Sequence, residues 1–309
     1  MFGISKYNYE SFTRDLLNKQ MEASRTGAGP EPGEPAPDFE GRTLDGKTVR
    51  LGEYRGRKNV VLTFGSVTCP MTAGSIGGIN ELYREHNGKD TQFLFVYVRE
   101  AHPGERIPAH GSMEEKTRAA QRLRDEEEIE MPILVDELRG PIHRKYGKPY
   151  SSTFLIDKSG RIAFRALWTQ PHAVENALEE LRERQRDRGV EHAIVNGGED
   201  RSFPLTYAMI HAYSALERGG EKSLADFRQA LGPRARLVLA SSRIAEPIAL
   251  NPGKAVATAA IAGGVLAAGL LAGRALREKR RSARTPYGVY EAKRKASRTG
   301  TDYNEPVGI

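Results

Sequence analysis

One residue of this chain is a candidate nucleophile both by its type and by its place. Cys69 is the only cysteine among 309 residues and lies in the stretch GSVTCPMT, residues 65–72. A short apolar run rich in β-branched residues, 59–65, leads into it, and a run with apolar residues at helical spacing, 72–86, follows. Pro70 suits the first position of a helix because its missing N–H would have no partner there. We therefore expect Cys69 at a strand-to-helix turn, where free backbone N–H groups and the helix dipole would lower the thiol pKa and favour a thiolate.

The missing second cysteine restricts the chemistry of this thiol. A single cysteine forms no internal disulfide, so the chain is not a disulfide-stapled secreted scaffold, and its CPMT sequence at 69–72 lacks the resolving thiol of a Cys-x-x-Cys motif. An oxidised or substituted Cys69 must be restored from outside, by a small thiol reductant or a thioredoxin-like protein. We expect no bound cofactor, and no ligand spacing in the sequence indicates a metal site.

Strand and helix patterns alternate around this thiol. Further strands are expected at 92–98, 132–136, 153–157 and 161–166, and further helices at 112–128, 138–146 and 171–186. Ser112 and Glu115 form a capping box at the start of the first of these helices. Asp45 and Gly46 indicate a hairpin turn ahead of the first strand. The order β-α-β-α-β-α-β-β-α predicts an α/β thioredoxin-like fold with a helical C-terminal extension.

Composition divides the chain into five segments. We expect an N-terminal helix and Gly/Pro linker at 1–35, a thioredoxin-like domain at 36–190, a helical extension at 191–250, a transmembrane helix at 255–273 and a basic tail at 274–309. The fourth segment carries no charge and has the length of one membrane span; a buried or linker helix is the alternative. Because of this segment we expect a membrane-associated protein. The N-terminus has no continuous apolar run typical of a signal peptide, so we expect the catalytic domain to be cytoplasmic.

Charge and glycine spacing near the C-terminus indicate partners. The tail, 274–309, holds ten Lys or Arg against four Asp or Glu, which accounts for six of the seven net positive charges of the chain. Such a tail predicts binding to anionic membrane lipid, and because no nucleic-acid motif accompanies it, we expect no nucleic-acid partner. Gly269 and Gly273 have the GxxxG spacing of helices that associate in lipid, which would allow a homodimer. The extension reads as helical from 196 to 233 with a break at Gly219-Gly220, and no motif in it suggests a function.

Three stretches of the sequence resemble the iodothyronine deiodinases and their bacterial relatives, a branch of the thioredoxin-like superfamily. The sequence GSVTCP matches the Gly-Ser-x-Thr-selenocysteine-Pro motif of that family, with Cys69 in the place of selenocysteine. The sequence FLFVYVREAHP, 93–103, matches a strand that ends in Glu-Ala-His, and AHGSMEEKTRAA, 109–120, matches a helix start preceded by a second family histidine. The likeness covers roughly 60–181, and Ser152 stands where the family has a substrate-binding arginine.

The resemblance implies a role for each of seven residues. Cys69 would be the nucleophile, and Glu100 and His102 would complete the catalytic group. Proton relay and substrate positioning would fall to Ser66, Thr68, Tyr97 and His110. The implied reaction is reductive dehalogenation of a small halogenated aromatic molecule, of the thyroxine 5'-deiodinase type, with an external thiol as reductant. Histidine suits the proton transfers because it titrates near neutral pH.

Two other functions stay open at this stage. The first is a one-cysteine thiol peroxidase resembling the peroxiredoxins, in which a Thr or Ser stands three residues before the cysteine, as Ser66 does here; the proline expected four residues earlier is Leu62. The second is a non-enzymatic, membrane-anchored module for redox sensing or binding. Trp168 is interpreted as a packing residue, and five histidines without a partner pattern are interpreted as structural: His86, His143, His172, His192 and His211.

Overall fold

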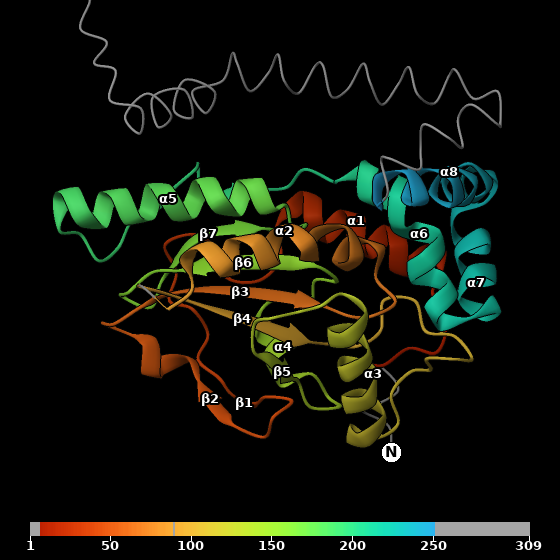
Figure 1. The fold of residues 1–309 in the computed structure, drawn as a ribbon, viewed down its shortest axis with the longest axis horizontal. Helices are drawn as coiled ribbons and strands as arrows, with labels where there is room; N and C mark the ends of the chain where they lie inside the picture. The colour runs from red at the N-terminus through yellow and green to blue at the C-terminus, as the bar shows by residue number, and fades with distance from the viewer. Residues whose placement is uncertain (1–6, 89, 251–309) are drawn as a thin grey trace, which may run out of the picture. The chain divides into compact units, whose positions relative to one another are not determined.

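The computed structural model describes residues 7–88 and 90–250 of the chain. Its centre is a mixed six-stranded sheet of order β5-β4-β3-β6-β7-β8 (Figure 1). The strands are β3 (Asn59–Gly65), β4 (Thr91–Tyr97), β5 (Ile133–Val135), β6 (Ser152–Ile156), β7 (Ile162–Ala166) and β8 (Glu199–Asp200). Strands β3, β4 and β5 are mutually parallel, β6 runs antiparallel to β3, and β7 runs antiparallel to β6. This parallel βαβ half followed by a β-hairpin confirms the predicted thioredoxin-like arrangement.

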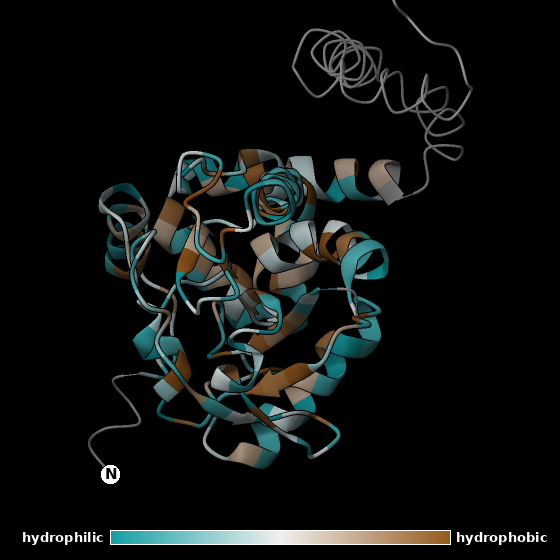
Figure 2. Ribbon diagram, turned by 90° about the vertical axis from the view of Figure 1, so that its left-hand side faces the viewer, coloured by the Kyte–Doolittle hydropathy of each residue, from teal (hydrophilic) through white to brown (hydrophobic). Residues whose placement is uncertain are grey.

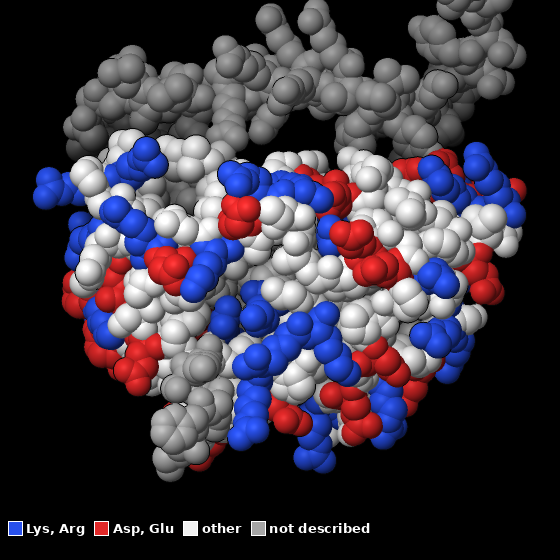
Figure 3. Space-filling model, turned by 180° about the vertical axis from the view of Figure 1, so that it is seen from behind, with Lys and Arg blue, Asp and Glu red and all other residues white. Residues whose placement is uncertain are grey.

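The central strands are buried on both faces, which explains why they read as continuous apolar runs rather than alternating ones. Every residue of β3 is buried. Val61 contributes to an apolar cluster on one face with α2, α3 and α5, whereas its neighbour Leu62 contributes to a cluster on the other face. Hydrophobic segments accordingly lie inside the ribbon of Figure 2. On the face shown in Figure 3, acidic and basic side chains are interspersed.

Helices and a small hairpin cover the sheet. The helices are α1 (Arg14–Thr26), η1 (Leu51–Tyr54), α2 (Pro70–His86), α3 (Met113–Glu126), α4 (Pro141–Lys145), α5 (Pro171–Arg188), α6 (Leu205–Gly219), α7 (Glu221–Leu231) and α8 (Pro233–Leu250). The hairpin pairs β1 (Glu40–Arg42) with β2 (Thr48–Arg50), and Gly46 in its turn has φ of 81°, a conformation that glycine adopts without strain. The predicted turn at Asp45-Gly46 is thus confirmed.

The capping box at the start of α3 forms in a modified way. The Ser112 hydroxyl accepts a hydrogen bond from the Glu115 N–H at 3.2 Å, as predicted. The Glu115 carboxylate, however, accepts from the N–H of Gly111 at 2.8 Å rather than from that of Ser112. Both bonds satisfy backbone donors at the helix N-terminus, so the helix still begins where the pattern indicated.

The extension consists of helices that pack on the domain rather than stand apart from it. Helix α6 lies against α2, and the described residues up to 246 form one compact unit (Figure 1). The break between α6 and α7 falls at Gly220, whose φ of 102° favours glycine, as the sequence predicted. The predicted helix over 196–233 is confirmed from Leu205 onward but was wrong for 196–204, where Glu199 and Asp200 pair with β7 as the short strand β8.

Within residues 7–88 and 90–250, no helix combines the length and apolar character needed to cross a membrane. The predicted transmembrane helix at 255–273 and the basic tail at 274–309 lie outside the described residues. The single-pass topology, the lipid partner and the homodimer therefore stay predictions.

Candidate functional site

Cys69 lies at the edge of the sheet where four chain segments meet. The parallel strands β3 and β4 both end at this edge, which is where open α/β sheets place their ligands. Because β6 is antiparallel to β3 and β7 is antiparallel to β6, the start of β6 and the end of β7 lie there too. Cys69 follows β3, Glu100 and His102 follow β4, Ser152 begins β6, and Trp168 follows β7.

The thiol stands at the start of α2 as predicted but is enclosed. Cys69 is the N-cap residue, Pro70 is the first helical residue, and Cys69 is only 2% exposed. Burial raises the pKa of the Cys69 thiol, although hydrogen bonds from Thr72 and from the Met71 backbone act in the opposite direction. The expectation of a lowered thiol pKa was therefore wrong for this conformation, because desolvation outweighs the helix N-terminus.

Glu100 is the centre of a buried hydrogen-bond network beside the thiol. One carboxylate oxygen accepts from the hydroxyl of Thr68 at 2.6 Å and from its N–H at 3.2 Å. The other accepts from the hydroxyl of Tyr97 and lies 2.9 Å from His110 Nε2. Burial would raise the pKa of Glu100, but the hydrogen bonds and charge of His110, with the Thr68 and Tyr97 hydroxyls, hold it below its usual range. Glu100 is thus a carboxylate, and His110 carries a proton on Nε2.

A second set of bonds joins the cysteine loop to the segment after β4. The Ser66 hydroxyl accepts from the Ala101 N–H at 3.2 Å, and the Thr68 hydroxyl accepts from the His102 N–H at 3.0 Å. Since both hydroxyls lie within three residues of Cys69, they fix the loop that carries this cysteine. Ser66 and Thr68 therefore bond to this segment and position the loop.

The side chain of His102 lies apart from the Glu100 network, to which only its backbone N–H is joined through Thr68. Its ring is sandwiched between Phe12, with ring centroids 4.2 Å apart, and Phe227, at 5.7 Å. Burial lowers the pKa of His102 to about 3, so the ring is neutral near pH 7. Its Nδ1 is buried and has no hydrogen-bond partner among the described residues. The structure thus brings together Thr68, Tyr97, Glu100 and His110 and places His102 in an apolar environment.

Segments outside the thioredoxin-like core cover the thiol. Cys69 and Trp168 belong to one buried apolar cluster with residues of the N-terminal segment and of α6, α7 and α8, among them Phe12, Leu216 and Phe227. We call Phe12 together with α6–α8 the cover. Sequence reasoning missed it, because the apolar positions of these helices show an amphipathic face without showing which surface that face meets.

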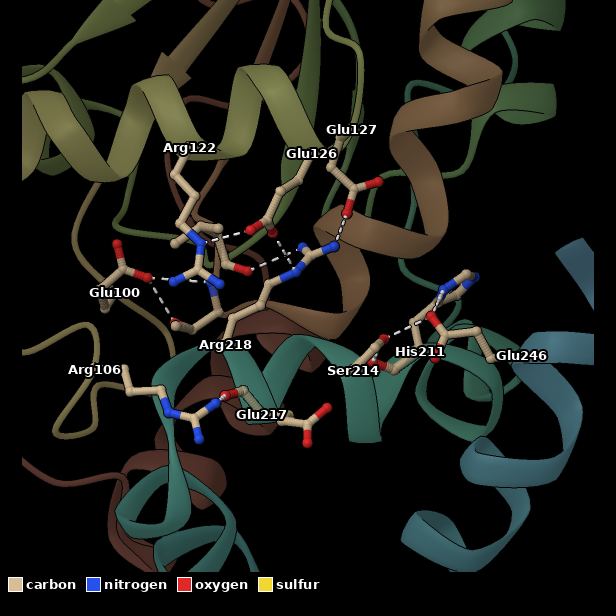
Figure 4. Close-up of polar contacts among 12 residues, drawn as sticks. Glu100, Arg106, Arg122, Glu126, Glu127, His211, Ser214, Glu217, Arg218 and Glu246 are labelled. Atoms are coloured by element: carbon tan, nitrogen blue, oxygen red, sulfur yellow. Dashed lines mark hydrogen bonds and ion pairs between the residues drawn. The ribbon is translucent and has the colours of Figure 1, made fainter.

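Polar contacts hold the cover in place. The carboxylate of Glu105, just after His102, accepts from the backbone N–H groups of Glu221 at 2.6 Å and Lys222 at 2.9 Å, at the N-terminus of α7. Arg218 of α6 donates to the carbonyl of Val67 in the cysteine loop at 3.2 Å. Its guanidinium also pairs with Glu126 at 2.8 Å and Glu127 at 2.5 Å, at the end of α3 (Figure 4). Residues on both sides of Cys69 are thus tied to the extension.

Arg99 is a further residue of this edge that the sequence analysis missed. Its guanidinium lies over the rings of Tyr7, Tyr9 and Tyr150, at 5.0, 5.1 and 5.6 Å. Tyr9 in turn donates to the carbonyl of Ala101 at 2.8 Å. The N-terminal segment is thus anchored across the end of β4. In the described part of the chain, no group of His, Cys, Asp and Glu side chains could hold a metal ion.

The sheet topology and the N-capping cysteine together define a thioredoxin-like α/β domain, and comparisons with known proteins agree. Residues 32–165 match the model of the AhpC/TSA family. Thyroxine 5-deiodinase of Ovis aries is 29% identical over 144 residues, which cover 43% of this chain and 48% of the relative. The thiol-disulfide oxidoreductase ResA of Bacillus thuringiensis is 26% identical over 133 residues, which cover 43% and 67%. The predicted resemblance to deiodinases is therefore confirmed.

The lengths over which the chain matches known proteins are limited. The exposed lipoprotein thioredoxin of Streptococcus pneumoniae is 28% identical and covers 47% of this chain and 100% of its own, with a TM-score of 0.36. The chain spans about half the length of the deiodinase relative it matches. The protein accordingly has a thioredoxin-like fold and is similar in sequence to deiodinases over less than half of its length.

Proposed function

We propose that this protein is a thiol-dependent reductase of the deiodinase-like group, in which Cys69 attacks a small halogenated aromatic substrate. The observation that carries the proposal is the link between the cysteine loop and a buried acid–base pair. A cysteine at a helix N-terminus sits on a loop whose Thr68 is bonded to the Glu100 carboxylate, and Glu100 in turn holds His110. A nucleophile with an adjacent buried acid–base pair is the arrangement that such a reaction requires.

The proposed reaction is balanced by two external thiols. The Cys69 sulfur takes the halogen as the carbon–halogen bond breaks, the bonding electron pair stays on the ring carbon, and that carbon accepts a proton. A first thiol then displaces halide from the sulfur and forms a mixed disulfide. A second thiol releases Cys69 and leaves as the external disulfide. No cofactor takes part, and either a small thiol or a thioredoxin-like protein supplies the electrons.

The two histidines have different parts in this proposal. His110 and Glu100 form the proton-transfer pair, because Glu100 is ionised and faces the protonated Nε2 of His110. His102 is neutral and keeps an unbonded Nδ1, so it would hydrogen-bond to a polar group of the substrate. Since Cys69 and His102 are both buried under the cover, the substrate and the reductant reach the thiol only when Phe12 or α6–α8 move.

A one-cysteine peroxidase is the second candidate, and the match of residues 32–165 to the AhpC/TSA family favours it. The thiolate would attack the peroxide oxygen, giving a sulfenic acid and an alcohol, and two external thiols would restore Cys69 with release of water. Two observations weigh against it. Leu62 stands where a proline is expected, and the Ser66 hydroxyl is engaged with the Ala101 N–H.

One experiment separates these functions. The full chain is incubated with dithiothreitol and either an iodinated phenol or hydrogen peroxide, and iodide release and peroxide consumption are followed. We expect iodide release that is lost in Cys69→Ser and kept in Ser75→Ala, a buried hydroxyl on α2 that bonds only to the carbonyl of Thr72. Fast peroxide consumption without iodide release would favour the peroxidase. If Cys69→Ser changed neither rate, only the non-enzymatic binding or sensing module would be left.

A further inference from the structure

We propose that a cavity next to the catalytic edge binds small aromatic anions. The cavity has a volume of about 460 Å³ and lies between α1, the end of β7 and the segment that joins β8 to α6. Met21 and Arg25 line it from α1, and Trp168, Arg201 and Phe203 line it from the other side. This volume falls within the range of small-molecule sites. The inference goes beyond the proposed function, because binding here does not require a reactive thiol.

Two aromatic rings and a thioether give the cavity an apolar wall. The rings of Trp168 and Phe203 meet edge to face, with centroids 5.0 Å apart and planes at 84°. Phe203 and Met21 are each 38% exposed, so part of this apolar surface faces water in the absence of a ligand. An aromatic ring placed against Phe203 and Met21 would remove that surface from water.

The Trp168 indole has an unmet hydrogen-bonding need. Its Nε1–H is buried and has no partner among the described residues, and an indole N–H is a donor only. Leaving a buried donor unpaired costs roughly 1 to 3 kcal/mol. Because Trp168 lines the cavity, a ligand that turns its ring enough to place an acceptor oxygen at Nε1 would remove this cost, which a purely apolar ligand would not.

The charges around the cavity favour an anion. Arg165 and Arg201 share one carboxylate, that of Glu199, at 2.9 Å and 2.5 Å, so two guanidinium groups stand against a single negative charge. Arg25 also lines the cavity, but it pairs at 2.5 Å with Glu22, which lines the cavity too, so the positive excess comes from Arg165 and Arg201; both side chains of the Arg25–Glu22 pair are more than half exposed. The local excess of positive charge and the fork geometry of arginine suit a carboxylate or sulfonate.

The cavity lies beside the thiol rather than on it. Trp168 follows β7, and Cys69 follows β3, two strands away in the sheet. With strands about 4.8 Å apart, the separation across the sheet is roughly 10 Å. Trp168 also belongs to the buried cluster that contains Cys69. A ligand bound in this cavity would therefore contact the same cluster without occupying the position of the sulfur.

The single tryptophan of the chain makes the proposal measurable. Because Trp168 is the only tryptophan, the tryptophan fluorescence reports on the surroundings of this one residue, which lines the cavity. The full chain with Cys69→Ser, which rules out any reaction, is titrated with 4-iodobenzoate, whose iodine quenches indole fluorescence on contact, and with the neutral 4-iodobenzyl alcohol. We expect saturable quenching by 4-iodobenzoate, with a Kd about tenfold lower than for the alcohol, and competition by benzoate but not by cyclohexanecarboxylate.

Arginine variants test the charge recognition directly. Arg201→Gln should raise the Kd for 4-iodobenzoate about fivefold or more and leave the alcohol unaffected, whereas Arg201→Lys should restore part of the affinity. Arg186→Gln is the matched control, since Arg186 is an exposed arginine of α5 paired only with the adjacent Asp187, and its Kd should not change. Thermal unfolding of each variant shows that the fold is kept.

Two results would overturn the proposal: linear, unsaturable quenching that is equal for the acid and the alcohol, or a Kd for 4-iodobenzoate that Arg201→Gln leaves unchanged. The test is independent of catalysis. A protein that binds 4-iodobenzoate in this way but releases no iodide from any substrate would contradict the proposed function and leave the binding site standing.

Discussion

His110 and His102 are both buried at the same edge of the sheet, yet their surroundings are opposite. His110 lies in a polar network in which both oxygens of Glu100 have partners, and this network is complete without any ligand. His102 contacts the rings of Phe12 and Phe227, two members of the cluster that also holds Cys69, and its Nδ1 is unbonded. The polar half, with Glu100 and His110, is therefore preorganised. The apolar half, with Cys69 and His102, contains an unbonded buried nitrogen and is closed by the cover.

This contrast indicates where a substrate enters. A saturated network gains nothing from a new partner, while a buried, unbonded nitrogen gains a hydrogen bond. Under the proposed function, the Cys69 and His102 half would receive the substrate, and the Glu100 and His110 half would supply a fixed charge and a proton. Variants that act on one half and not on the other test this division.

The largest effect is expected in the polar half. Glu100→Ala removes the acceptor of His110, Thr68 and Tyr97 at once and leaves buried donors unpaired. We expect the free energy of unfolding to fall by about 3 to 5 kcal/mol in urea titrations. Glu130→Ala is the control, because Glu130 is exposed and pairs with Arg84 at the surface, and its effect should stay below about 1 kcal/mol. Equal losses in the two variants would remove the claim that the network is preorganised.

His102 should make stability depend on acidity. Its pKa is about 3 in the folded protein against 6.5 ordinarily, so the unfolded chain binds the proton first as the pH falls. The free energy of unfolding is therefore unaffected by this group above about pH 6.5 and decreases as the pH falls from there towards 3, by about 5 kcal/mol at most.

The check compares how steeply the free energy of unfolding changes with pH in two chains. In His102→Gln this contribution disappears, so the free energy of unfolding should fall less steeply between neutral and acid pH than in the unaltered protein. His143, also buried with a pKa lowered mainly by burial, is present in both chains and cancels in the difference. Parallel slopes would show that His102 is already solvated in the folded state.

Opening the cover should make the thiol accessible. Phe227→Ala removes the ring beside His102 and should lower the free energy of unfolding by about 3 kcal/mol. We expect iodoacetamide to alkylate Cys69 at least about tenfold faster near pH 7, because local opening becomes easier. Leu82→Ala is the control, since Leu82 is a buried residue of α2 in the core cluster on one face of the sheet. If both variants accelerated alkylation equally, access would occur by global unfolding.

The smallest effect concerns the polar tie between the extension and the cysteine loop. Arg218→Gln loses the ion pairs with Glu126 and Glu127 and weakens the contact to the Val67 carbonyl (Figure 4). We expect a loss of about 1 to 2 kcal/mol and a rise in the alkylation rate of about threefold. Arg122→Gln, which removes the other partner of Glu126, should leave the alkylation rate unchanged. A faster alkylation of Cys69 in Arg122→Gln would assign the effect to α3 instead.

Local patterns predicted the positions of the elements and of the nucleophile. The β-branched run before Cys69 and the proline after it are sufficient to place the thiol at the start of α2, because strand period and helix capping are properties of neighbouring residues. The meeting of Thr68, Glu100 and His110 was predicted only through the family resemblance, since nothing in their spacing shows that their side chains bond to one another.

The electrostatic state of the thiol could not be read from the sequence. Its pKa is raised because residues such as Phe12 and Phe227, which lie at opposite ends of the described chain, close over it. Tertiary packing decides which surface an amphipathic helix covers. The apolar positions of α6 and α7 therefore did not show in the sequence that these helices cover Cys69. The same holds for β8, whose two residues become a strand only because β7 offers an open edge.

The contact between Gly104 and Gly219 has a consequence for transplanting this extension to other redox domains. A Cβ on Gly104 would lie 2.2 Å from the Gly219 carbonyl oxygen, and a Cβ on Gly219 would lie 2.8 Å from that of His102. Space rather than backbone conformation therefore requires glycine at both positions. A methyl group at either position would push the two backbone segments apart. Only a thioredoxin-like domain with glycine two residues after the corresponding histidine would allow these helices to pack at the same distance.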